Sequence, residues 1–581
     1  MSSFAQRLEQ LRQLIKAAGL DGFVLDRADA FQGEEVRPCD ERLAWMTGFD
    51  GSAGTAVILA DKAALFSDSR YSLQLERQLD STLWQGFDTA EKGLADWLAA
   101  QAAPARLTLG YASETTTPAR LRRWQKISGR LDWQALPAHP VDPIWTDRPA
   151  PAPRAVWQVP DHLAGQTAAE KLAALREKMA AGGAQAQLVT DPMAVNWLFN
   201  LRGNDLAHTP VHLCFALIPE QGQPVLIGAE AGAASLAGAE GVALSDAGKM
   251  LASLSGQKLA LDRASCPLLI ADLASSSGAE IVWQEDPLIG MKACKNSAEL
   301  AGFHAAHLQD ALAFVEFWHW LEQQDVTGFT ESQLADQLQQ YRAAKPGYIC
   351  DSFPAIVGFA ENAAVVHYRA RPGQDRQITA DNLLLIDSGG HYQQGTTDIT
   401  RTLAIGSPPA EAVAAASSVL AGHCELARAR FPAQSSGAQL DALARAPLWE
   451  KQLDYGHGTG HGVGHILSVH EGPVSLSPRS DKPVQAGMVL SNEPGYYQPG
   501  SFGVRQENLV AVEQADAGWL KLAPLTLVPF DRRLADPAFF STDQLAWLNQ
   551  YHRSVEAALR PHLPASMQGW LAEKCAPIGD W

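Results

Sequence analysis

The stretch from residue 383 to residue 405 constrains the fold most, because it contains two apolar runs that each adjoin an aspartate. Residues 383–386 form the first run, which ends at Asp387, and residues 399–405 form the second, which follows Asp398. This pattern predicts two β-strands joined by a tight connection. An unpaired carboxylate in an apolar setting is strongly disfavoured. Either both aspartates face solvent at the strand ends, or a cation lies between them.

Composition limits the class of protein. With 581 residues, 46% of them hydrophobic, the chain can bury several cores, and its length favours three or four domains. Acidic residues outnumber basic ones by 64 to 46, and the net charge of -18 would repel polyanions, so we expect no nucleic-acid partner. Seven scattered cysteines without a CxxC pair are typical of reduced thiols. No apolar stretch approaches the roughly 18 residues of a membrane span, and the N-terminus lacks a signal peptide's apolar core. These features predict a cytoplasmic protein that does not contact membranes.

Residues 1–290 read as two diverged copies of one α/β module. Each copy begins with a helix that ends in alanine and glycine and continues with alternating strands and helices, and Trp45 and Trp197 occupy equivalent places. The alternative is that any two α/β segments look alike at this level of detail. The first copy ends in residues 136–153, where six prolines exclude regular structure and mark a boundary.

A second boundary falls near Gly290. The predicted domains are therefore 1–150, 151–292 and 293–581. In the third domain, Asn296 and Glu299 form a capping box for a long helix to about Gln324, and a second capping box, Ser541 with Gln544, begins a structural helix that runs through Leu559.

The segment 456–473 combines five alternating glycines with four histidines. His457, His461 and His465 are spaced four apart, as zinc ligands on a helix would be, but each interior glycine costs a helix about 1 kcal/mol. The glycines favour an extended strand or loop. Residues two apart then share a face, so His457 and His461 could both point into one site. The glycines do not match the GxGxxG phosphate-binding pattern in any register.

Two later segments each add a carboxylate. Residues 488–497 form an apolar strand interrupted by Glu493, and residues 502–512 are predicted to be one strand with Arg505, Glu507 and Leu509 on one face. A solvated face would explain each carboxylate taken singly.

Taken together, the carboxylates and one imidazole predict a dinuclear metal centre. The candidate ligands are Asp387, Asp398, His461, Glu493 and Glu507. Five ligands rich in oxygen exceed what one ordinary zinc ion takes, and they suit two divalent ions such as manganese or cobalt that share bridging carboxylates. Such centres hold a water or hydroxide and polarise a carbonyl.

The order of these motifs resembles that of the pita-bread metallopeptidases, and among them the Xaa-Pro aminopeptidases (aminopeptidase P). The motifs are DSG and TTD, GHGTGHG, VHEGP, NEPGYY and RxEN, with Asp387 and Asp398 eleven apart and Glu493 and Glu507 fourteen apart. The resemblance covers the whole chain, including the IWTDRP linker at 144–149, and it is to the three-domain cytosolic form. It implies two creatinase-like N-terminal α/β modules followed by a pita-bread catalytic domain of the α+β type.

The resemblance also implies a role for each site residue. Asp387 would bind one metal ion, His461 and Glu493 the other, and Asp398 and Glu507 would bridge both, with Glu493 also handling the proton of the bridging water. Catalysis and substrate binding would involve three further histidines and two supporting residues, which are His367, His457, His470, Tyr497 and Arg505. Gln394 departs from the pattern, since many relatives have aspartate there, but it is not a ligand position and we expect little effect.

The implied function is hydrolysis of the N-terminal Xaa-Pro bond of peptides by a homodimer that holds two divalent ions, Mn²⁺ foremost and Co²⁺ or Zn²⁺ as alternatives. The residues themselves give no signal for the dimer. Two alternatives remain open, an Xaa-Pro dipeptidase (prolidase) and a peptidase-like binding module that has lost its chemistry. The intact ligand set disfavours the binding module and also creatinase, which shares the fold without those ligands. Methionine aminopeptidase lacks the two N-terminal modules.

Overall fold

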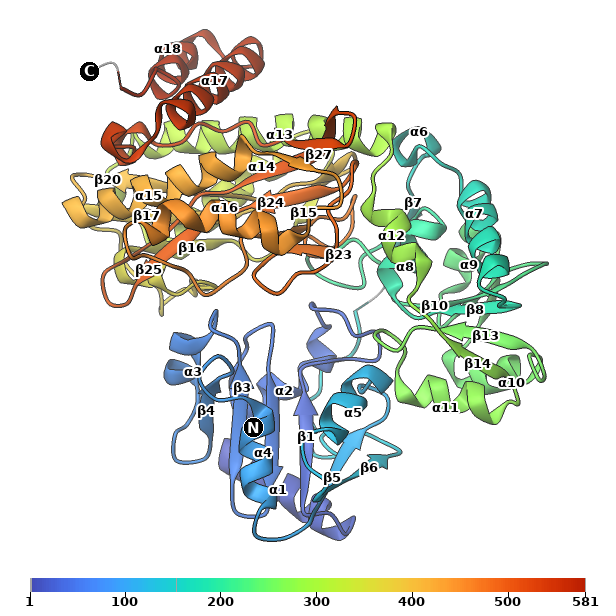
Figure 1. Cartoon of the computed structure of the whole chain (residues 1–581). Coiled ribbons are helices and arrows are strands. Elements are labelled where there is room, and N and C mark those ends of the chain that lie inside the picture. The colour runs from blue at the N-terminus through green and yellow to red at the C-terminus, as the bar shows by residue number, and fades with distance from the viewer. Residues whose placement is uncertain (1–2, 153, 580–581) are drawn as a thin grey trace. The chain divides into compact units, whose positions relative to one another are not determined.

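A computed structural model describes residues 3–152 and 154–579 (Figure 1). The chain forms two compact units, one comprising Met1–Val159 with Gln166–Leu288 and the other Pro160–Gly165 with Ile289–Trp581. Among the described residues, every helix is too short or too polar to cross a membrane.

The first unit contains two six-stranded sheets with the same topology. The first sheet has the order β4-β3-β2-β1-β5-β6, with β1 antiparallel to β2 and parallel to β5. Its strands are β1 (Gly22–Asp26), β2 (Thr55–Leu59), β3 (Ala63–Ser67), β4 (Gln85–Asp88), β5 (Leu107–Ala112) and β6 (Leu131–Leu136). Its helices are α1 (Phe4–Ala17), α2 (Arg42–Thr47), α3 (Ser72–Gln78), α4 (Leu94–Ala102) and α5 (Pro118–Gln125).

The second sheet repeats this arrangement in the order β12-β11-β10-β8-β13-β14, with β8 antiparallel to β10 and parallel to β13. Its strands are β8 (Ala186–Val189), β10 (Phe215–Pro219), β11 (Val225–Ile227), β12 (Glu240–Val242), β13 (Lys258–Leu261) and β14 (Glu280–Trp283). Its helices are α7 (Ala168–Ala181), α8 (Pro192–Leu198), α9 (Ala231–Ala237), α10 (Ala247–Ala252) and α11 (Leu268–Ser276), and a small separate sheet pairs β7 (Val156–Gln158) with β9 (Leu201–Gly203).

The shared strand order confirms the predicted internal repeat. Trp45 lies in α2, between β1 and β2, and Trp197 lies in α8, between β8 and β10, so the two tryptophans occupy equivalent places. The described part of the proline-rich segment, residues 137–152, contains no helix or strand, consistent with its five prolines, and the sixth, Pro153, lies outside the described residues.

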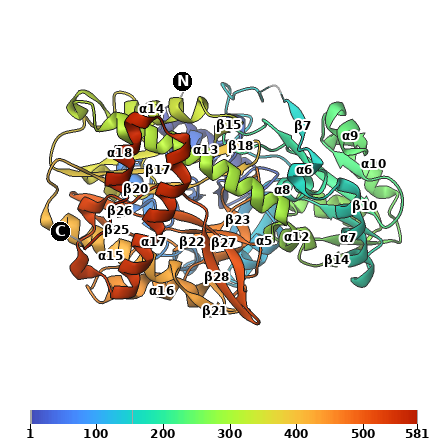
Figure 2. The ribbon, with the colours of Figure 1, turned by 90° about the horizontal axis from the view of Figure 1, so that it is seen from above.

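The second unit begins with α6 (Asp161–Ala164) and resumes at α12 (Pro287–Ala293). The predicted capping boxes are both present, at Asn296 for α13 (Ser297–Leu321) and at Ser541 for α17 (Thr542–Leu559). The other helices are α14 (Glu331–Ala343), α15 (Ala410–Ala427), α16 (Gly437–Trp449) and α18 (Ala565–Lys574). Figures 1 and 2 show α17 and α18 beside α13.

The strands of this unit form four sheets. Two three-stranded sheets have the orders β15-β18-β19 and β16-β17-β20, one sheet pairs β25 with β26, and a six-stranded sheet has the order β21-β28-β27-β24-β22-β23. Their bounds are β15 (Tyr348–Asp351), β16 (Ile356–Phe359), β17 (Asn382–Ser388), β18 (Gly390–Tyr392), β19 (Gly395–Thr396), β20 (Ile399–Ile405), β21 (Arg430–Pro432), β22 (Gly460–Gly462), β23 (Glu471–Leu476), β24 (Val489–Asn492), β25 (Gly495–Gln498), β26 (Phe502–Arg505), β27 (Asn508–Asp516) and β28 (Trp519–Pro524).

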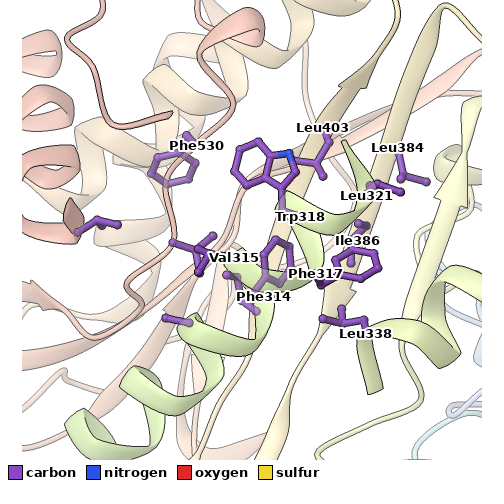
Figure 3. Close-up of a cluster of buried hydrophobic side chains, with 14 of the residues drawn as sticks. Phe314, Val315, Phe317, Trp318, Leu321, Leu338, Leu384, Ile386, Leu403 and Phe530 are labelled. Carbon is purple, nitrogen blue, oxygen red and sulfur yellow. The ribbon is translucent and has the colours of Figure 1, made fainter. Parts of the chain in front are cut away.

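The largest core of this unit lies around α13 (Figure 3). Phe314, Phe317 and Trp318 of α13 are almost completely buried against Leu384 of β17 and Leu403 of β20. Burying such side chains stabilises the fold by about 1.5–3 kcal/mol each. The two strands next to the aspartates are therefore held by a rigid helix.

Two strand predictions need comment. The two predicted strands are present as β17 and β20, which pair antiparallel, and the predicted tight connection between them is a small hairpin formed by β18 and β19. The prediction of one strand over residues 502–512 was wrong. The segment breaks at Gln506 and Glu507, because β26 pairs with β25 whereas β27 pairs with β24 and β28 in another sheet. The alternation of residue types continues across the point where the pairing partner changes, so the sequence pattern does not reveal the break.

Candidate metal centre

Asp387 and Asp398 lie at the adjoining ends of β17 and β20. Asp387 is in β17 opposite Thr400, and Asp398 immediately precedes β20. Both carboxylates are buried. The antiparallel pairing brings two residues that are eleven apart in sequence to the same end of one sheet.

His461 and Glu493 come from the neighbouring six-stranded sheet. His461 is in β22, which pairs with β24, and Glu493 directly follows β24. Ser491 of β24 joins them, because its hydroxyl accepts from the backbone N–H of His461 at 2.9 Å and donates to Glu493 Oε1 at 3.2 Å. The glycine-rich segment is extended, as predicted, and Gly460 is required because a Cβ there would lie 2.0 Å from the carbonyl oxygen of Ser491.

Glu507 occupies the break between β26 and β27. Its backbone N–H donates to the carbonyl of Thr400 at 3.1 Å, and the Thr400 hydroxyl donates to Glu507 Oε2 at 2.8 Å. The strand break therefore turns the Glu507 side chain toward β20.

These elements bring the predicted ligands together. Asp398, His461 and Glu507 each offer one ligand atom, and these atoms lie within 4.8 Å of one another. His461 Nε2 is 3.6 Å from Asp398 and 3.4 Å from Glu493. His461 Nδ1 lies 3.0 Å from the carbonyl of Gly462, so Nδ1 donates and Nε2 keeps its lone pair for a ligand.

The carboxylates repel one another. Burial raises the pKa of Asp398 well above its usual value, and the charges of Glu507 and Asp387 raise it further. Burial likewise raises the pKa of Glu507, with added repulsion from Glu493 and Asp387. Burial raises the pKa of Glu493 to about 7, although Arg505 opposes the shift.

The residues fit divalent cations. Within the described residues, neither Asp387 Oδ1 nor Asp398 Oδ1 has a hydrogen-bond partner, although both atoms are buried. A bound cation would satisfy these oxygens and remove the repulsion that raises the carboxylate pKa values. Four carboxylates with one imidazole form an oxygen-rich donor set of the kind that hard divalent ions take.

Arg505 links Asp387 to an aromatic side chain beside the site. Its guanidinium donates to Asp387 Oδ2 at 2.5 Å and to the hydroxyl of Tyr497 at 2.6 Å, and His457 Nε2 is 2.8 Å from the same hydroxyl. Arg505 also lies 3.4 Å from the carbonyl of Val366, the residue before His367. The predicted supporting residues thus form one chain that ends on a predicted ligand.

The remaining predicted histidines differ in their surroundings. The exposed ring of His470 lies edge-on to the ring of His461, with centroids 4.3 Å apart. His367 is half-buried, in the segment that Arg505 contacts through Val366. Both can therefore be reached from solvent.

Three supporting residues were missed in the sequence. Thr400 holds Glu507, Thr402 accepts from the backbone N–H of Arg505 and donates to its carbonyl, and Ser491 joins His461 to Glu493. Asp398, Thr400 and Thr402 are two apart, so period-two alternation on a strand could have placed both threonines on the face of the aspartate. Ser491 carried no comparable signal.

Glu471 and two lysines form a buried cluster close to the site. Lys292 Nζ is 3.0 Å from Glu471, and Lys295 also pairs with this carboxylate. Glu471 pairs with Gly462, next to His461, and follows His470 in sequence. Because the lysines are about 180 positions from Glu471 in the chain, no sequence pattern indicates that the three residues meet.

Family models match almost the whole chain. The description "Creatinase/Prolidase N-terminal domain" applies to residues 7–141 and again to residues 147–299. "Metallopeptidase family M24" matches residues 301–514, and "C-terminal region of peptidase_M24" matches residues 518–578. The chain is therefore an M24 metallopeptidase preceded by creatinase-type domains.

Relatives that match over nearly the whole chain identify the family within the M24 metallopeptidases. A probable Xaa-Pro aminopeptidase P of Laccaria bicolor is 35% identical over 99% of this chain and 93% of its own length, and aminopeptidase P2 of Arabidopsis thaliana is 34% identical over 99% of this chain and 88% of its own. The chain belongs to the aminopeptidase P family.

A solved structure agrees with this assignment. It is described as the X-prolyl aminopeptidase of Caenorhabditis elegans, a cytosolic enzyme with a di-nuclear active site. It matches with a TM-score of 0.94 and 29% identity over 100% of both chains. An Xaa-Pro dipeptidase from Bacillus anthracis, at 23% identity and a TM-score of 0.52 over 63% of this chain and 99% of its own, shares the fold alone.

Proposed function

We propose that this protein is a metal-dependent aminopeptidase that hydrolyses the bond between the N-terminal residue of a peptide and a proline in the second position. The observation that carries the proposal is the convergence of Asp398, His461 and Glu507, whose ligand atoms lie within 4.8 Å of one another. It supports this function because the chain is related over its full length to aminopeptidases P.

Two divalent cations would be held by the five predicted ligands. Asp387 would bind one ion, His461 and Glu493 the other, and the buried carboxylates of Asp398 and Glu507 both. The excess of oxygen donors favours Mn²⁺, with Co²⁺ or Zn²⁺ as alternatives. When bound, such ions polarise a peptide carbonyl and lower the pKa of a water molecule toward neutrality.

The protein's own groups would move the protons. Glu493 is held by Ser491 beside His461, where its free carboxylate oxygen can take a proton from the attacking water. The proline nitrogen must gain a proton as it leaves. His470 or His367 can donate it, because a histidine titrates near neutral pH and both side chains are open to substrate.

The remaining groups would orient the substrate and the ligands. An Xaa-Pro bond has no N–H, so the proline is recognised by the shape of its ring. His367, His457, His470 and Tyr497 supply flat surfaces for that ring. Arg505 holds Tyr497 and Asp387 together, so the substrate wall and the metal ligands are fixed by one guanidinium.

The domain organisation, the oligomeric state and the cellular location are proposed from the same family relationship. We propose three domains, 1–150, 151–292 and 293–581, a homodimer, and a cytoplasmic location. The Caenorhabditis elegans neighbour is described as cytosolic, and the seven cysteines form no disulfide bond among the described residues. Light scattering during size-exclusion chromatography would test the dimer.

A peptide panel tests the activity. Peptides of two to five residues, with proline or alanine in the second position, would be incubated with purified protein before and after addition of Mn²⁺, and with Asp398→Ala as control. We expect Mn²⁺-dependent release of the first residue from the proline peptides, including those of three or more residues. Cleavage of dipeptides alone would indicate a prolidase. No cleavage together with no bound metal would indicate a binding module.

A further inference from the structure

His465 lies at a junction of three segments beside the metal centre. Its side chain is buried, and its Nε2 is 2.7 Å from the backbone carbonyl of Gln394, in the turn between β18 and β19. Because a carbonyl oxygen only accepts, Nε2 carries the hydrogen and donates. Its ring packs against Phe303 of α13 at 5.7 Å between centroids, and its Nδ1 lies 3.9 Å from Glu299.

Helix α13 forms the third side of this junction. A Cβ on Gly302 would lie 2.2 Å from the carbonyl oxygen of Gln394 and 3.1 Å from His465 Nε2. A Cβ on Gly395 would lie 3.2 Å from the Cα of Phe303. The helix, the turn and the imidazole are therefore in close contact, and the turn has little room to move.

The hydrogen bond joins the two segments that carry predicted ligands. His465 is four residues after His461, and Gln394 is four residues before Asp398. The imidazole of His461 and the carboxylate of Asp398 lie 3.6 Å apart. No strand pairing joins β22 to the β18–β19 hairpin, since they belong to different sheets. A side-chain bond is therefore a direct connection between the two segments.

We propose that His465 is a positioning residue for the metal centre, which fixes the segment of His461 relative to the segment of Asp398. The proposal rests on the metal-binding function proposed above. The group that His465 contacts is the backbone carbonyl of Gln394, so the bond does not depend on the side chain at position 394. His465 is not one of the five proposed ligands, and it would act through the spacing of two of them.

The test is a titration of the full-length, metal-free protein with Mn²⁺. Calorimetry measures the affinity of each ion, and metal analysis after dialysis measures how many ions stay bound. His465→Leu keeps the buried apolar volume and removes the donor. His465→Gln can place an amide N–H near the position of Nε2. His307→Leu is the matched control, because His307 is also buried and its Nδ1 is 2.8 Å from the carbonyl of Phe303, within one helix.

We expect His465→Leu to weaken the binding of at least one of the two ions by about 10–100-fold, the usual effect of losing a group that orients a ligand. His465→Gln should bind both ions almost as the parent does, and so should His307→Leu. Thermal unfolding of the metal-free forms should not rank the variants in the same order.

Several outcomes would overturn the proposal. One is His465→Leu binding two ions as tightly as the parent. A second such outcome is that His465→Leu and His307→Leu both lose metal affinity, each only in proportion to its loss of stability in the metal-free state. If His465→Leu does not fold, it is replaced by His465→Asn, whose amide is too short to reach Gln394. Equal Mn²⁺ affinities of His465→Asn and His465→Gln would then reject the positioning role of His465. A parent that binds no Mn²⁺ would instead reject the proposed function.

Discussion

At the scale of single residues, the carboxylates of this site lower the stability of the metal-free protein. Asp398 and Glu507 are buried, and burial together with neighbouring negative charge raises the pKa of each well above its usual value. Residues selected for packing alone would not be arranged in this way. The instability is the expected consequence of a site that is complete only with cations.

The first prediction concerns Glu507→Gln in the metal-free protein. A carboxylate whose pKa is raised by folding destabilises the fold as pH rises from its unfolded pKa, near 4.5, through its folded pKa. We therefore expect Glu507→Gln to stabilise the metal-free protein at pH 8, since it removes a buried carboxylate that neighbouring charges repel. The gain should vanish near pH 4. Urea unfolding at several pH values measures it, and a destabilised variant at pH 8 would contradict it.

The second prediction concerns activity. Asp398→Ala and Glu507→Ala should each abolish turnover almost completely, because each carboxylate would be shared by the two ions, and without it the neighbouring cations would repel each other. Asp387→Ala should mainly lower the occupancy of one site. Metal analysis beside turnover measures both effects. Near-normal turnover with two ions bound in both bridging variants would show that the ligands are wrongly assigned.

The third prediction concerns the open histidines. His470→Ala and His367→Ala should lower turnover by about two to four orders of magnitude, the range for a positioned proton donor. Metal content should be retained, although the His470 ring contacts the His461 ring at 4.3 Å. If activity falls only in proportion to lost metal, these histidines support the ligands and do not act on substrate.

The sequence predicted residues that the structure brings close together, because a carboxylate beside an apolar run is rare enough to be informative. For Thr400 the sequence offered the period-two spacing from Asp398, whereas Ser491 carried no comparable signal, since a hydroxyl in a strand is ordinary. Nor did the sequence assign His465, whose partner is a backbone carbonyl 71 positions away. Backbone groups carry no sequence signal.

At the scale of elements, capping boxes predicted α13 and α17 well, because caps are local. The break between β26 and β27 was not predictable from residues 502–512, since the two halves have different strand partners. The buried cluster of Lys292, Lys295 and Glu471 was not predictable for the same reason, because its members come from separate segments. It joins the end of α12 and the loop before α13 to the start of β23.

The fourth prediction belongs to that cluster. Burial opposes the charge of Glu471, but the two lysines outweigh it and lower the pKa of this carboxyl. The ionised Glu471 therefore stabilises the fold above its unfolded pKa, near 4.5. This stabilisation is lost as the pH falls from there through the folded pKa. Glu471→Gln should destabilise the protein at pH 7 by about 3–5 kcal/mol, because it leaves buried ammonium groups without their carboxylate. The surface variant Glu513→Gln, which loses a half-exposed pair with Lys521, is the control. Equal effects of the two changes would reject the argument.

At the scale of the whole molecule, the chain separates into two units with their own cores. The repeated sheet of the first unit was predictable, because each copy has its own periodic pattern. The membership of α6 in the second unit was not, because it reflects contacts with residues far along the chain, among them Asn296, whose amide donates to the carbonyl of Ala164 at 2.8 Å. A single side chain thus joins segments 132 positions apart.

The fifth prediction follows from this division. All five proposed ligands lie in the second unit, within Ile289–Trp581, and an ion that binds only the folded state stabilises it by about 2.7 kcal/mol at a concentration 100 times its dissociation constant. Addition of Mn²⁺ should therefore slow hydrogen exchange in β17, β20, β22 and β27, where opening exposes the ligands. Strands β1 and β8 of the first unit should exchange at unchanged rates. Mass spectrometry of peptic fragments, with Asp398→Ala as control, measures this. Equal protection of both units in the parent would show that they unfold as one, and protection that persists in Asp398→Ala would show that Mn²⁺ binds elsewhere.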